Sequence, residues 1–375
     1  MQPLSGLKVL DFSTLLPGPM ATLMLAEAGA EVIKIEKPGG EDMRRFQPML
    51  PGGASAPYTV LNRGKRVVEI DLKDVDAARR LRPLIEAADI VMEQFRPGVM
   101  DRLGLGYEAM RAINPRLIYC SISGYGQNGP RAHEAGHDVN YIAASGLLSL
   151  SPGTPEAPTL PPALIADIAG GAMPAVLNIL LALRERDATG VGRRIDVAMA
   201  EGSLVFCWYA MAQGHAQGRY PGARENFLTG ASPRYGLYAT KDGFFACGAL
   251  EQKFWDGFCD VVGLPAELRM DHRDPEATRA AIVALVKART AAQWEPALAA
   301  ADCCVTVVRT LEEALADPHF AARGVFEHGV ETPDGARVPA IVTPVAEAFR
   351  GASKTRPPRG RWSWMKAPAE GGRPA

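Results

Sequence analysis

The alternation of apolar strand-like segments with helix-like segments in the first third of the chain restricts its fold more than any other feature. Strand-like runs occupy residues 7–12, 31–36, 66–70, 89–95 and 117–123, and helix-like runs occupy residues 20–28, 74–87 and 107–113. Strands interleaved with helices are typical of a mainly parallel sheet, with functional loops at the carboxyl ends of its strands. We therefore predict an α/β fold built on a large Rossmann-like domain.

The sequence pattern changes near Gly218, where Pro, Gly and Asn become frequent and the strand-like segments become shorter. A chain of 375 residues with 47% hydrophobic side chains can bury more than one core. We predict a large domain at 1–217, a linker at 218–230, a smaller α+β domain at 231–323 and a return segment at 324–350. A tail rich in Pro, Gly and basic residues follows at 351–375.

Charge and cysteine usage narrow the range of partners. The chain has 41 Lys and Arg against 42 Asp and Glu, all dispersed, which favours a small-molecule ligand over nucleic acid or a membrane. The apolar run at 170–183 contains Pro174 and is bounded by Arg184, so we expect a buried helix rather than a membrane span. Six scattered cysteines and a patterned segment that begins close to Met1 indicate a cytoplasmic protein without a disulfide framework.

Several common catalytic signatures do not fit. The loop after the first strand-like run reads L-L-P-G-P, so it lacks the G-x-G-x-x-G fingerprint of nicotinamide and flavin enzymes. A P-loop, paired Cys spacing for zinc and a G-x-S-x-G nucleophile elbow are also missing from the sequence. We predict no metal site, and acid-base or carboxylate chemistry remains.

Two groups of cations lie next to strand-like runs. Arg63, Lys65 and Arg66 occupy a turn before one strand, and Arg96 follows the end of another. Arg offers a bidentate fork and Lys a point charge to phosphate groups, so both groups are candidate phosphate ligands. Lys37 is a weaker candidate. The alternative interpretation is that these side chains merely face water.

Three segments contain residues able to transfer protons. His137 follows a Gly-rich loop and precedes Asp138, a carboxylate that could orient its imidazole. Asp167 begins an apolar helix-like run, either as a helix cap or as a carboxylate whose pKa burial would raise. Glu251 closes another apolar run, as a cap or as a group pointing into a site. A hydrogen-bonded structural role for His137 also stays open.

The order of several separated motifs resembles the family III CoA-transferase superfamily. These motifs are L-K-V-L-D-F-S, L-P-G-P, E-V-I-K-I-E-K-P-G-G, N-R-G-K-R, F-R-P-G-V-M-D-R-L-G-L-G-Y and S-G-Y-G-Q-N-G-P, and the resemblance spans residues 4–349. It implies an interlocked homodimer of ring-shaped subunits, with CoA bound along the large domain. The expected CoA contacts are Lys37, Arg63, Lys65, Arg66, Arg96, Gly124, Tyr125 and Gly126. CoA belongs to the acyl-CoA substrate, so no separate cofactor is expected.

Within that superfamily the chain is most similar to the racemases of 2-methylacyl-CoA thioesters. Their motifs match A-G-H-D-V-N-Y at 135–141, A-D-I-A-G-G at 166–171 and G-A-L-E at 248–251. The resemblance assigns catalytic roles to His137, Asp167 and Glu251, with Glu251 supplied by the partner subunit and Asp138 as a further orienting group. Transferases of the superfamily keep the carboxylate at the position of Asp167 but usually lack the His.

One segment departs from the racemase pattern. Racemases commonly show L-D-G-G-A-P where this chain has L-T-G-A-S-P at 228–233, followed by Arg234. We expect these residues near the acyl group, so the departure leaves the acyl chain of the substrate open.

Two catalytic hypotheses follow. The first is a racemase or epimerase that removes the proton α to the thioester and returns one on the opposite face, which requires two acid-base groups and a stabilised enolate. The second is a CoA-transferase in which Asp167 forms an acyl anhydride and then an aspartyl-CoA thioester. His137 favours the first, and a CoA-binding scaffold without activity is a third interpretation.

Overall fold

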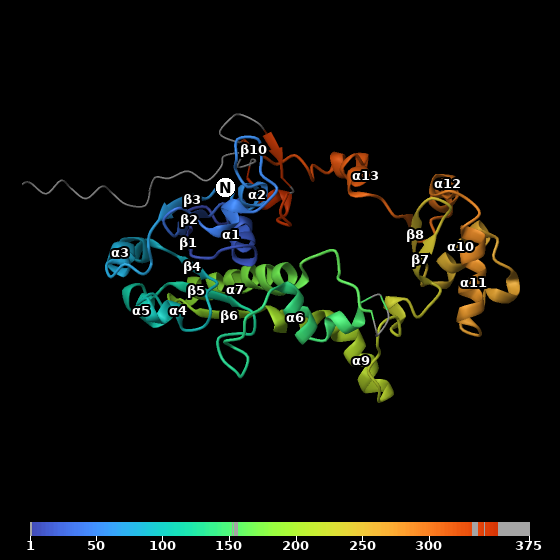
Figure 1. Cartoon of the computed structure of the whole chain (residues 1–375), viewed down its shortest axis with the longest axis horizontal. Coiled ribbons are helices and arrows are strands. Elements are labelled where there is room, and N and C mark those ends of the chain that lie inside the picture. Colours follow the sequence, from blue (N-terminus) through green and yellow to red (C-terminus); the bar gives the residue numbers. More distant parts are fainter. Residues whose placement is uncertain (1, 152, 154–156, 332–336, 341, 352–375) are drawn as a thin grey trace, which may run out of the picture. The chain divides into compact units, whose positions relative to one another are not determined.

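The computed structural model describes residues 2–151, 153, 157–331, 337–340 and 342–351, which form two compact units (Figure 1). Unit 1 comprises Met1–Ser145, Pro162–Val205 and Pro318–Ala375, and unit 2 comprises Gly146–Pro161 and Phe206–Asp317. These boundaries differ from the predicted ones. The second unit includes a segment from before the long apolar helix and begins ahead of the predicted linker, because the helix at 208–217 groups with it. The predicted tail from residue 352 onward lies outside the described residues.

Unit 1 is built around a six-stranded parallel sheet with the strand order β3-β2-β1-β4-β5-β6. Its strands are β1 (Lys8–Asp11), β2 (Glu31–Glu36), β3 (Arg66–Glu69), β4 (Ile90–Glu93), β5 (Ile118–Ser123) and β6 (Arg194–Ala198). This is the order of the doubly wound dinucleotide-binding fold, in which ligands bind beyond the carboxyl ends of the strands where the order reverses. The predicted parallel α/β sheet is therefore confirmed.

Helices cover both faces of this sheet. They are α1 (Pro17–Glu27), α2 (Ala56–Leu61), α3 (Ala77–Ala87), α4 (Val99–Arg102), α5 (Tyr107–Ile113), α6 (Asp138–Ala144), α7 (Met173–Thr189), α8 (Met199–Leu204) and α14 (Pro318–Ala322). Figure 1 shows α1 and α7 on one side of the sheet and α3 and α5 on the other. A short hairpin of β10 (Gly329–Glu331) and β11 (Arg337–Pro339) completes the unit.

The start of α1 closes the point where the strand order reverses. The helix begins at Pro17 rather than at the predicted residue 20, because proline fits the first turn of a helix. The backbone N–H of Gly18 donates to Oε1 of Gln94, directly after β4, over 3.0 Å. A Cβ at Gly18 would lie 2.2 Å from Cβ of Ser13, so this close approach requires glycine. The loops after β1 and β4 are thereby joined at the expected ligand-binding edge.

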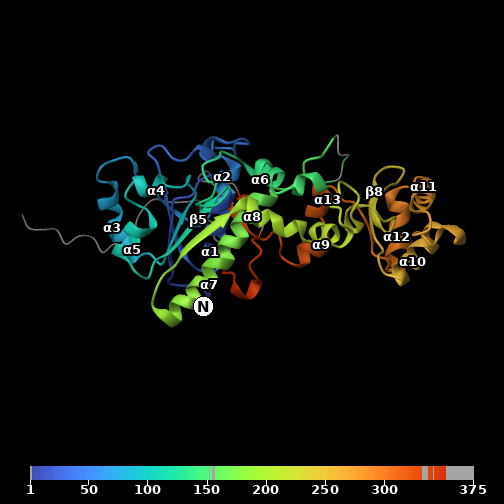
Figure 2. The same cartoon turned by 90° about the horizontal axis from the view of Figure 1, so that it is seen from below.

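The long apolar helix differs from its prediction. A π-helix, η3 (Ile165–Ala172), runs directly into α7, and together they form the one described helix that is long and apolar enough to cross a membrane. In the structure α7 packs on β5 and β6 (Figure 2). Only one face is buried, however, because Leu177 and Leu181 are each 59% exposed. The prediction of a buried helix is therefore wrong for one side of α7, which exposes apolar side chains.

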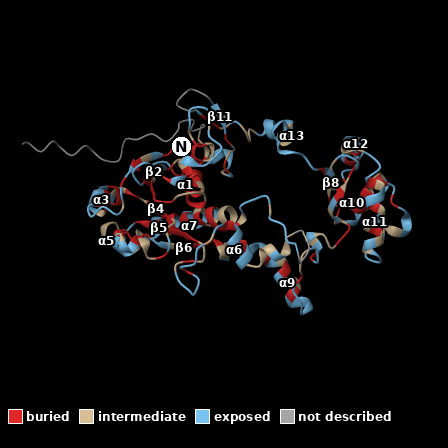
Figure 3. Cartoon of the chain, in the orientation of Figure 1, coloured by how far each residue is buried: buried red, intermediate tan, exposed pale blue. Residues whose placement is uncertain are grey.

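Unit 2 is an α+β structure with its own core. Its elements are α9 (Trp208–Gln217), β7 (Tyr235–Ala239), β8 (Phe244–Gly248), α10 (Gln252–Val262), α11 (Pro275–Val286), α12 (Ala291–Ala301), β9 (Val305–Val307) and α13 (Leu311–Leu315). The strands form an antiparallel sheet in the order β7-β8-β9. Aromatic side chains dominate the core, where Trp255, Phe258 and Phe245 are fully buried (Figure 3).

Candidate active site

The loop after β5 delivers His137 to the start of α6. The buried strand ends at Ser123, and the chain then crosses Gly124 and Gly126 before reaching the helix. His137 occupies the N-cap position with an extended backbone, and its backbone N–H donates to Oδ1 of Asn140 over 2.9 Å. Its side chain is exposed. The backbone is thus fixed at the start of α6, and the imidazole is accessible to solvent.

Tyr141 holds this segment in place and was not identified from the sequence. Its hydroxyl donates to the carbonyl of Gly136, and its buried ring lies where a Cβ at Gly124 would have to be. A Cβ at Gly136 would lie 2.7 Å from the same ring. The ring of Tyr125 meets it edge-on with the centroids 5.4 Å apart. The ring of Tyr141 therefore joins Gly124 to Gly136, the residue before His137, and the glycines on either side of Tyr125 were the available signal.

Asp138 connects the two segments that carry the candidate acid-base groups. Its buried carboxylate accepts a hydrogen bond of 2.9 Å from the backbone N–H of Asp167. The loop before α6 and the helix η3 are therefore brought together, as expected for a shared site. Asp138 acts here on the backbone of Asp167, and no hydrogen bond from its carboxylate to the His137 side chain occurs among the described residues.

A close approach of two backbones sets the position of η3. A Cβ at Gly170 would lie 2.8 Å from the carbonyl oxygen of Met199 in α8, and a Cβ at Gly202 would overlap the backbone of Gly170. Only glycine permits two helices to lie this close. Because single-turn widenings of helices often occur at functional sites, the π-helical geometry around Asp167 is consistent with a catalytic position.

The surroundings of Asp167 shift the pKa of its carboxyl toward neutral pH. Burial and, to a smaller extent, the negative charge of Asp138 raise this pKa to about 6, while His137 opposes the shift. Burial likewise raises the pKa of Tyr141 to about 12, with Asp167 adding to the effect and Arg96 opposing it. His137, Asp138, Tyr141 and Asp167 thus form one electrostatically coupled cluster in unit 1, within reach of Arg96.

Glu251 lies in unit 2, at the N-cap of α10. Its carbonyl accepts hydrogen bonds from the N–H groups of Phe254 and Trp255, each over 3.0 Å, and its side chain makes no capping bond. The side chain is exposed. The backbone of Glu251 therefore caps the helix, as one of the two interpretations expected. Its carboxylate takes no part in the cap.

Two of the predicted phosphate ligands are buried instead. The guanidinium of Arg63 forms an ion pair with Glu27, and both side chains are almost fully enclosed. The ammonium of Lys65 donates to the carbonyl of Pro19 over 2.8 Å and lies 3.3 Å from Asp11. Both cations stabilise the packing of α1 and β1, and their role as phosphate ligands stays a prediction.

The remaining predicted CoA contacts lie nearer the surface. Arg66, Arg96 and Lys37 are exposed, and the Lys37 ammonium lies 2.8 Å from Asp42. Arg96 follows β4 at the ligand-binding edge, whereas Arg66 begins the edge strand β3. Tyr125 is half-buried, and the guanidinium of Arg131 stacks 4.2 Å from its ring centroid.

The sequence contains one metal-binding pattern, although the prediction of no metal site assumed that H-E-x-x-H is missing. His133, Glu134 and His137 form an H-E-x-x-H sequence, which binds zinc when a helix places both imidazoles on one face. Here the residues precede α6 as a loop, and Glu134 pairs with Arg131. No group of three His, Cys, Asp or Glu side chains suited to a metal occurs within the described ranges.

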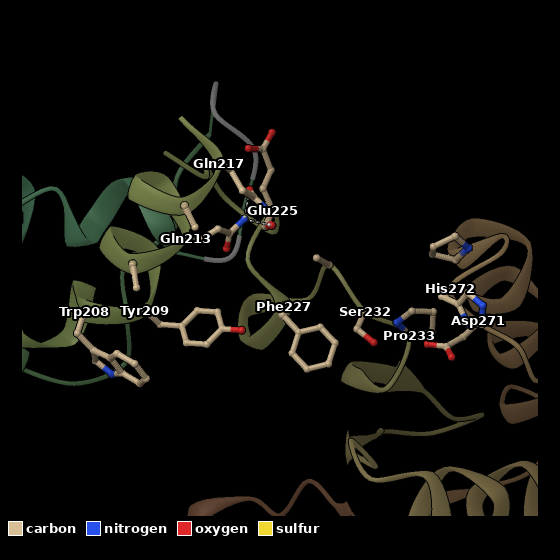
Figure 4. Close-up of a pocket in the computed structure, with 14 residues that line it drawn as sticks. Trp208, Tyr209, Gln213, Gln217, Glu225, Phe227, Ser232, Pro233, Asp271 and His272 are labelled. Atoms are coloured by element: carbon tan, nitrogen blue, oxygen red, sulfur yellow. Dashed lines mark hydrogen bonds between the residues drawn. The ribbon is translucent and has the colours of Figure 1, made fainter. Parts of the chain in front are cut away.

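Unit 2 contains an open cavity of about 820 Å³ (Figure 4). Trp208 and Tyr209 lie on one side, Asp271 and His272 on the other, and Phe227 between them. The segment 228–233, where the sequence departs from the racemase pattern, contributes to the wall. Its aromatic lining suits an apolar ligand group.

The chain is similar to enzymes that act on CoA thioesters. It matches the model of CoA-transferase family III over residues 4–361. It is 37% identical to alpha-methylacyl-CoA racemase of Homo sapiens over 86% of this chain and 82% of the relative. Acetyl-CoA:oxalate CoA-transferase of Acetobacter aceti is 35% identical over 86% of this chain and 85% of the relative. The crystal structure of a CAIB/BAIF family protein from Brucella suis superposes with a TM-score of 0.81 at 32% identity, covering 96% of each chain.

Proposed function

Because the chain belongs to CoA-transferase family III, we propose that it is a racemase that interconverts (2R)- and (2S)-2-methylacyl-CoA thioesters. The observation that carries this proposal is the coupling of Asp167 to His137, with the pKa of Asp167 raised to about 6. A group with such a pKa can act as a base or an acid near neutral pH. Asp167 alone would serve a transferase equally well, and the His beside it favours the racemase.

The proposed reaction consists of two proton transfers. One group of the pair removes the α proton, and the electron pair moves onto the thioester oxygen to give an enolate. The other group, protonated, delivers its proton to the opposite face of the α carbon, which inverts it. The roles of His137 and Asp167 exchange in the reverse direction, and the balance needs no cofactor beyond the CoA of the substrate. The absence of a redox step is compatible with the cytoplasmic location that we also propose.

We propose that CoA binds along unit 1, at the carboxyl ends of β1 and β4. Arg96 is exposed at this edge and influences Tyr141 electrostatically, which would bring a CoA phosphate or the pantetheine arm near the reacting carbon. Lys37, beyond β2, and Arg66, on β3, are candidates for the more distant phosphates.

We further propose that the active enzyme is a homodimer in which Glu251 of the partner subunit supports His137. Leu181 in α7 is 59% exposed, Val205 after α8 63% and Trp208 in α9 64%. Apolar side chains left this far in water are typical of protein interfaces. Sedimentation analysis at micromolar concentration should give a dimer, and a monomer with full activity would exclude shared sites.

The decisive assay separates inversion from transfer. A single enantiomer of a 2-methylacyl-CoA is incubated with the enzyme and excess of an unrelated free carboxylic acid, and products are resolved by chiral and by acyl-chain analysis. The proposal predicts the other enantiomer of the same thioester. A thioester of the added acid, with the original configuration retained, would contradict it.

A CoA-transferase remains the second candidate, favoured by Asp167 itself and by the 35% identity to a transferase. In that reaction the carboxylate attacks the thioester carbonyl and releases the CoA thiolate, which then attacks Asp167 of the resulting anhydride. Hydroxylamine added during turnover should then modify Asp167, as mass spectrometry of the peptide would detect. An unmodified Asp167 in turning-over enzyme excludes this candidate.

A further inference from the structure

The side chain of Arg234 bonds to both chain neighbours of Glu251 and makes no hydrogen bond to the Glu251 side chain. The guanidinium donates to the carbonyl of Leu250 over 3.2 Å and to Oε1 of Gln252 over 3.0 Å, the residues on either side of Glu251. It comes from the residue before β7, which pairs with β8 so that Tyr235 faces Gly248. We propose that Arg234 is a positioning residue that fixes the direction in which the Glu251 carboxylate leaves unit 2.

The guanidinium is itself held firmly. Its Nε and Nη2 both donate to Oδ1 of Asp271, over 3.0 and 2.8 Å, and the Arg234 and Asp271 side chains are only 13% and 9% exposed. Its Cζ stacks 4.9 Å from the ring centroid of the buried Trp255. Asp271 and the Trp255 ring therefore fix the plane of the guanidinium before it reaches residues 250 and 252.

This arrangement requires arginine. A planar fork with several donors can bond a carboxylate, a carbonyl and an amide oxygen together, whereas the ammonium of lysine is a single point with a flexible stem. A half-buried carbonyl and carboxylate would lose their partners if the fork were removed. Among the described residues no other hydrogen bond joins Leu250 to Gln252, so without the fork Glu251 would depend on the helix cap alone.

The proposal rests on the proposed function, in which Glu251 supports His137. It is tested with Arg234→Lys, with Glu251→Gln and with the double variant, each assayed for racemisation of a 2-methylacyl-CoA. Arg269→Lys is the matched control, because Arg269 is a half-buried arginine of unit 2 that pairs with Asp260 and has no bond to residues 250–252. All variants are checked by thermal melting.

We expect Arg234→Lys to lower kcat by about three- to tenfold, no more than Glu251→Gln itself, with KM nearly unchanged, because small displacements of a group in the active site are costly. Arg269→Lys should keep kcat. The double variant should be no slower than Glu251→Gln alone, since Arg234 acts only through Glu251. A loss in the double variant equal to the product of both single losses would overturn the proposal, as would an unchanged kcat in Arg234→Lys.

Amide hydrogen exchange separates this proposal from the proposed function. Exchange at residues 248–254 should become faster in Arg234→Lys and stay unchanged in Arg269→Lys, whether or not the wild-type enzyme racemises its substrate. If racemisation is absent but this difference is present, the proposed function fails and the positioning of Glu251 stands. Unchanged exchange at 248–254 in Arg234→Lys would overturn the positioning role in either case.

Discussion

The two units hold their candidate groups by different means. In unit 1, backbone approaches at glycines bring Asp167, Asp138 and His137 into one cluster, and burial shifts the pKa of Asp167. In unit 2, Glu251 is exposed and is fixed through its neighbours by Arg234. A buried carboxylate that interacts with neighbouring charges is suited to exchange protons with a substrate. An exposed carboxylate whose backbone alone is fixed is suited to a supporting role. We therefore propose that the proton transfers occur in unit 1.

The largest expected effect separates these two roles directly. Asp167→Asn should lower racemisation by about 1,000-fold, in the range of a lost acid-base group, while Glu251→Gln should lower it by about tenfold. Steady-state rates with both enantiomers provide the measurement. Equal losses in the two variants would show that Glu251 transfers a proton itself, and the comparison between the units would fail.

The packing of η3 against α8 tests whether unit 1 depends on its backbone approaches. Gly202→Ala places a Cβ into the backbone of Gly170, so we expect a loss of about 1 to 3 kcal/mol in the free energy of unfolding, together with activity. Gly222→Ala is the control, because its Cβ would lie 3.8 Å from the nearest atoms, on Glu225. Denaturant titration and rate measurements should show lower stability and lower activity in Gly202→Ala and no change in Gly222→Ala. Normal activity in that variant would contradict a tightly fixed Asp167.

Removal of one hydroxyl tests the support of His137. Tyr141→Phe keeps the ring between Gly124 and Gly136 but loses the hydrogen bond to the Gly136 carbonyl. Because such a bond contributes about 1 kcal/mol, we expect roughly a fivefold lower kcat and a small decrease in stability. Tyr125→Phe, which retains its edge-on ring, serves as the control. A larger effect on KM than on kcat would indicate a substrate contact instead.

The smallest expected effect is a pH dependence that belongs to unit 1 alone. Burial raises the pKa of Asp167 from 3.8 to about 6, so the folded state favours the protonated form. That stabilisation is fully present below pH 3.8 and is lost as the pH rises through 6. The melting temperature of Asp167→Asn relative to the wild type should therefore increase between pH 4 and 7, as scanning calorimetry can measure. A pH-independent difference for Asp167→Asn would contradict the raised pKa.

The sequence predicts the sheet of unit 1 well because each strand and helix in it has its own local hydrophobic period. It also identifies His137 and Asp167, since both follow recognisable motifs, although their convergence depends on Asp138 bonding a backbone N–H 29 positions away in the chain. The burial of Arg63 and Lys65 could not be predicted, because a sequence shows charges but not the buried Glu27 and Asp11 that pair with them.

The contributions of Tyr141 and Arg234 could not be foreseen for a similar reason. The ring of Tyr141 packs against Gly124 and Gly136, which lie at different distances before it in the sequence. Arg234 reaches residues 250 and 252 because β7 pairs with β8. Both effects depend on distances between segments rather than on the residues of one segment. The misplaced boundary of unit 2 has the same origin, because the affiliation of α9 is a matter of packing.

Deuterium incorporation tests the central claim most directly. A single enantiomer of a 2-methylacyl-CoA is incubated in deuterated water, and both enantiomers are isolated before equilibrium and examined for deuterium at the α carbon. The account predicts that the newly formed enantiomer carries deuterium there and that Asp167→Asn does not form it. Formation of the opposite enantiomer without deuterium, or no exchange with any chain length while CoA moves to another acid, would contradict proton transfer by the unit 1 cluster.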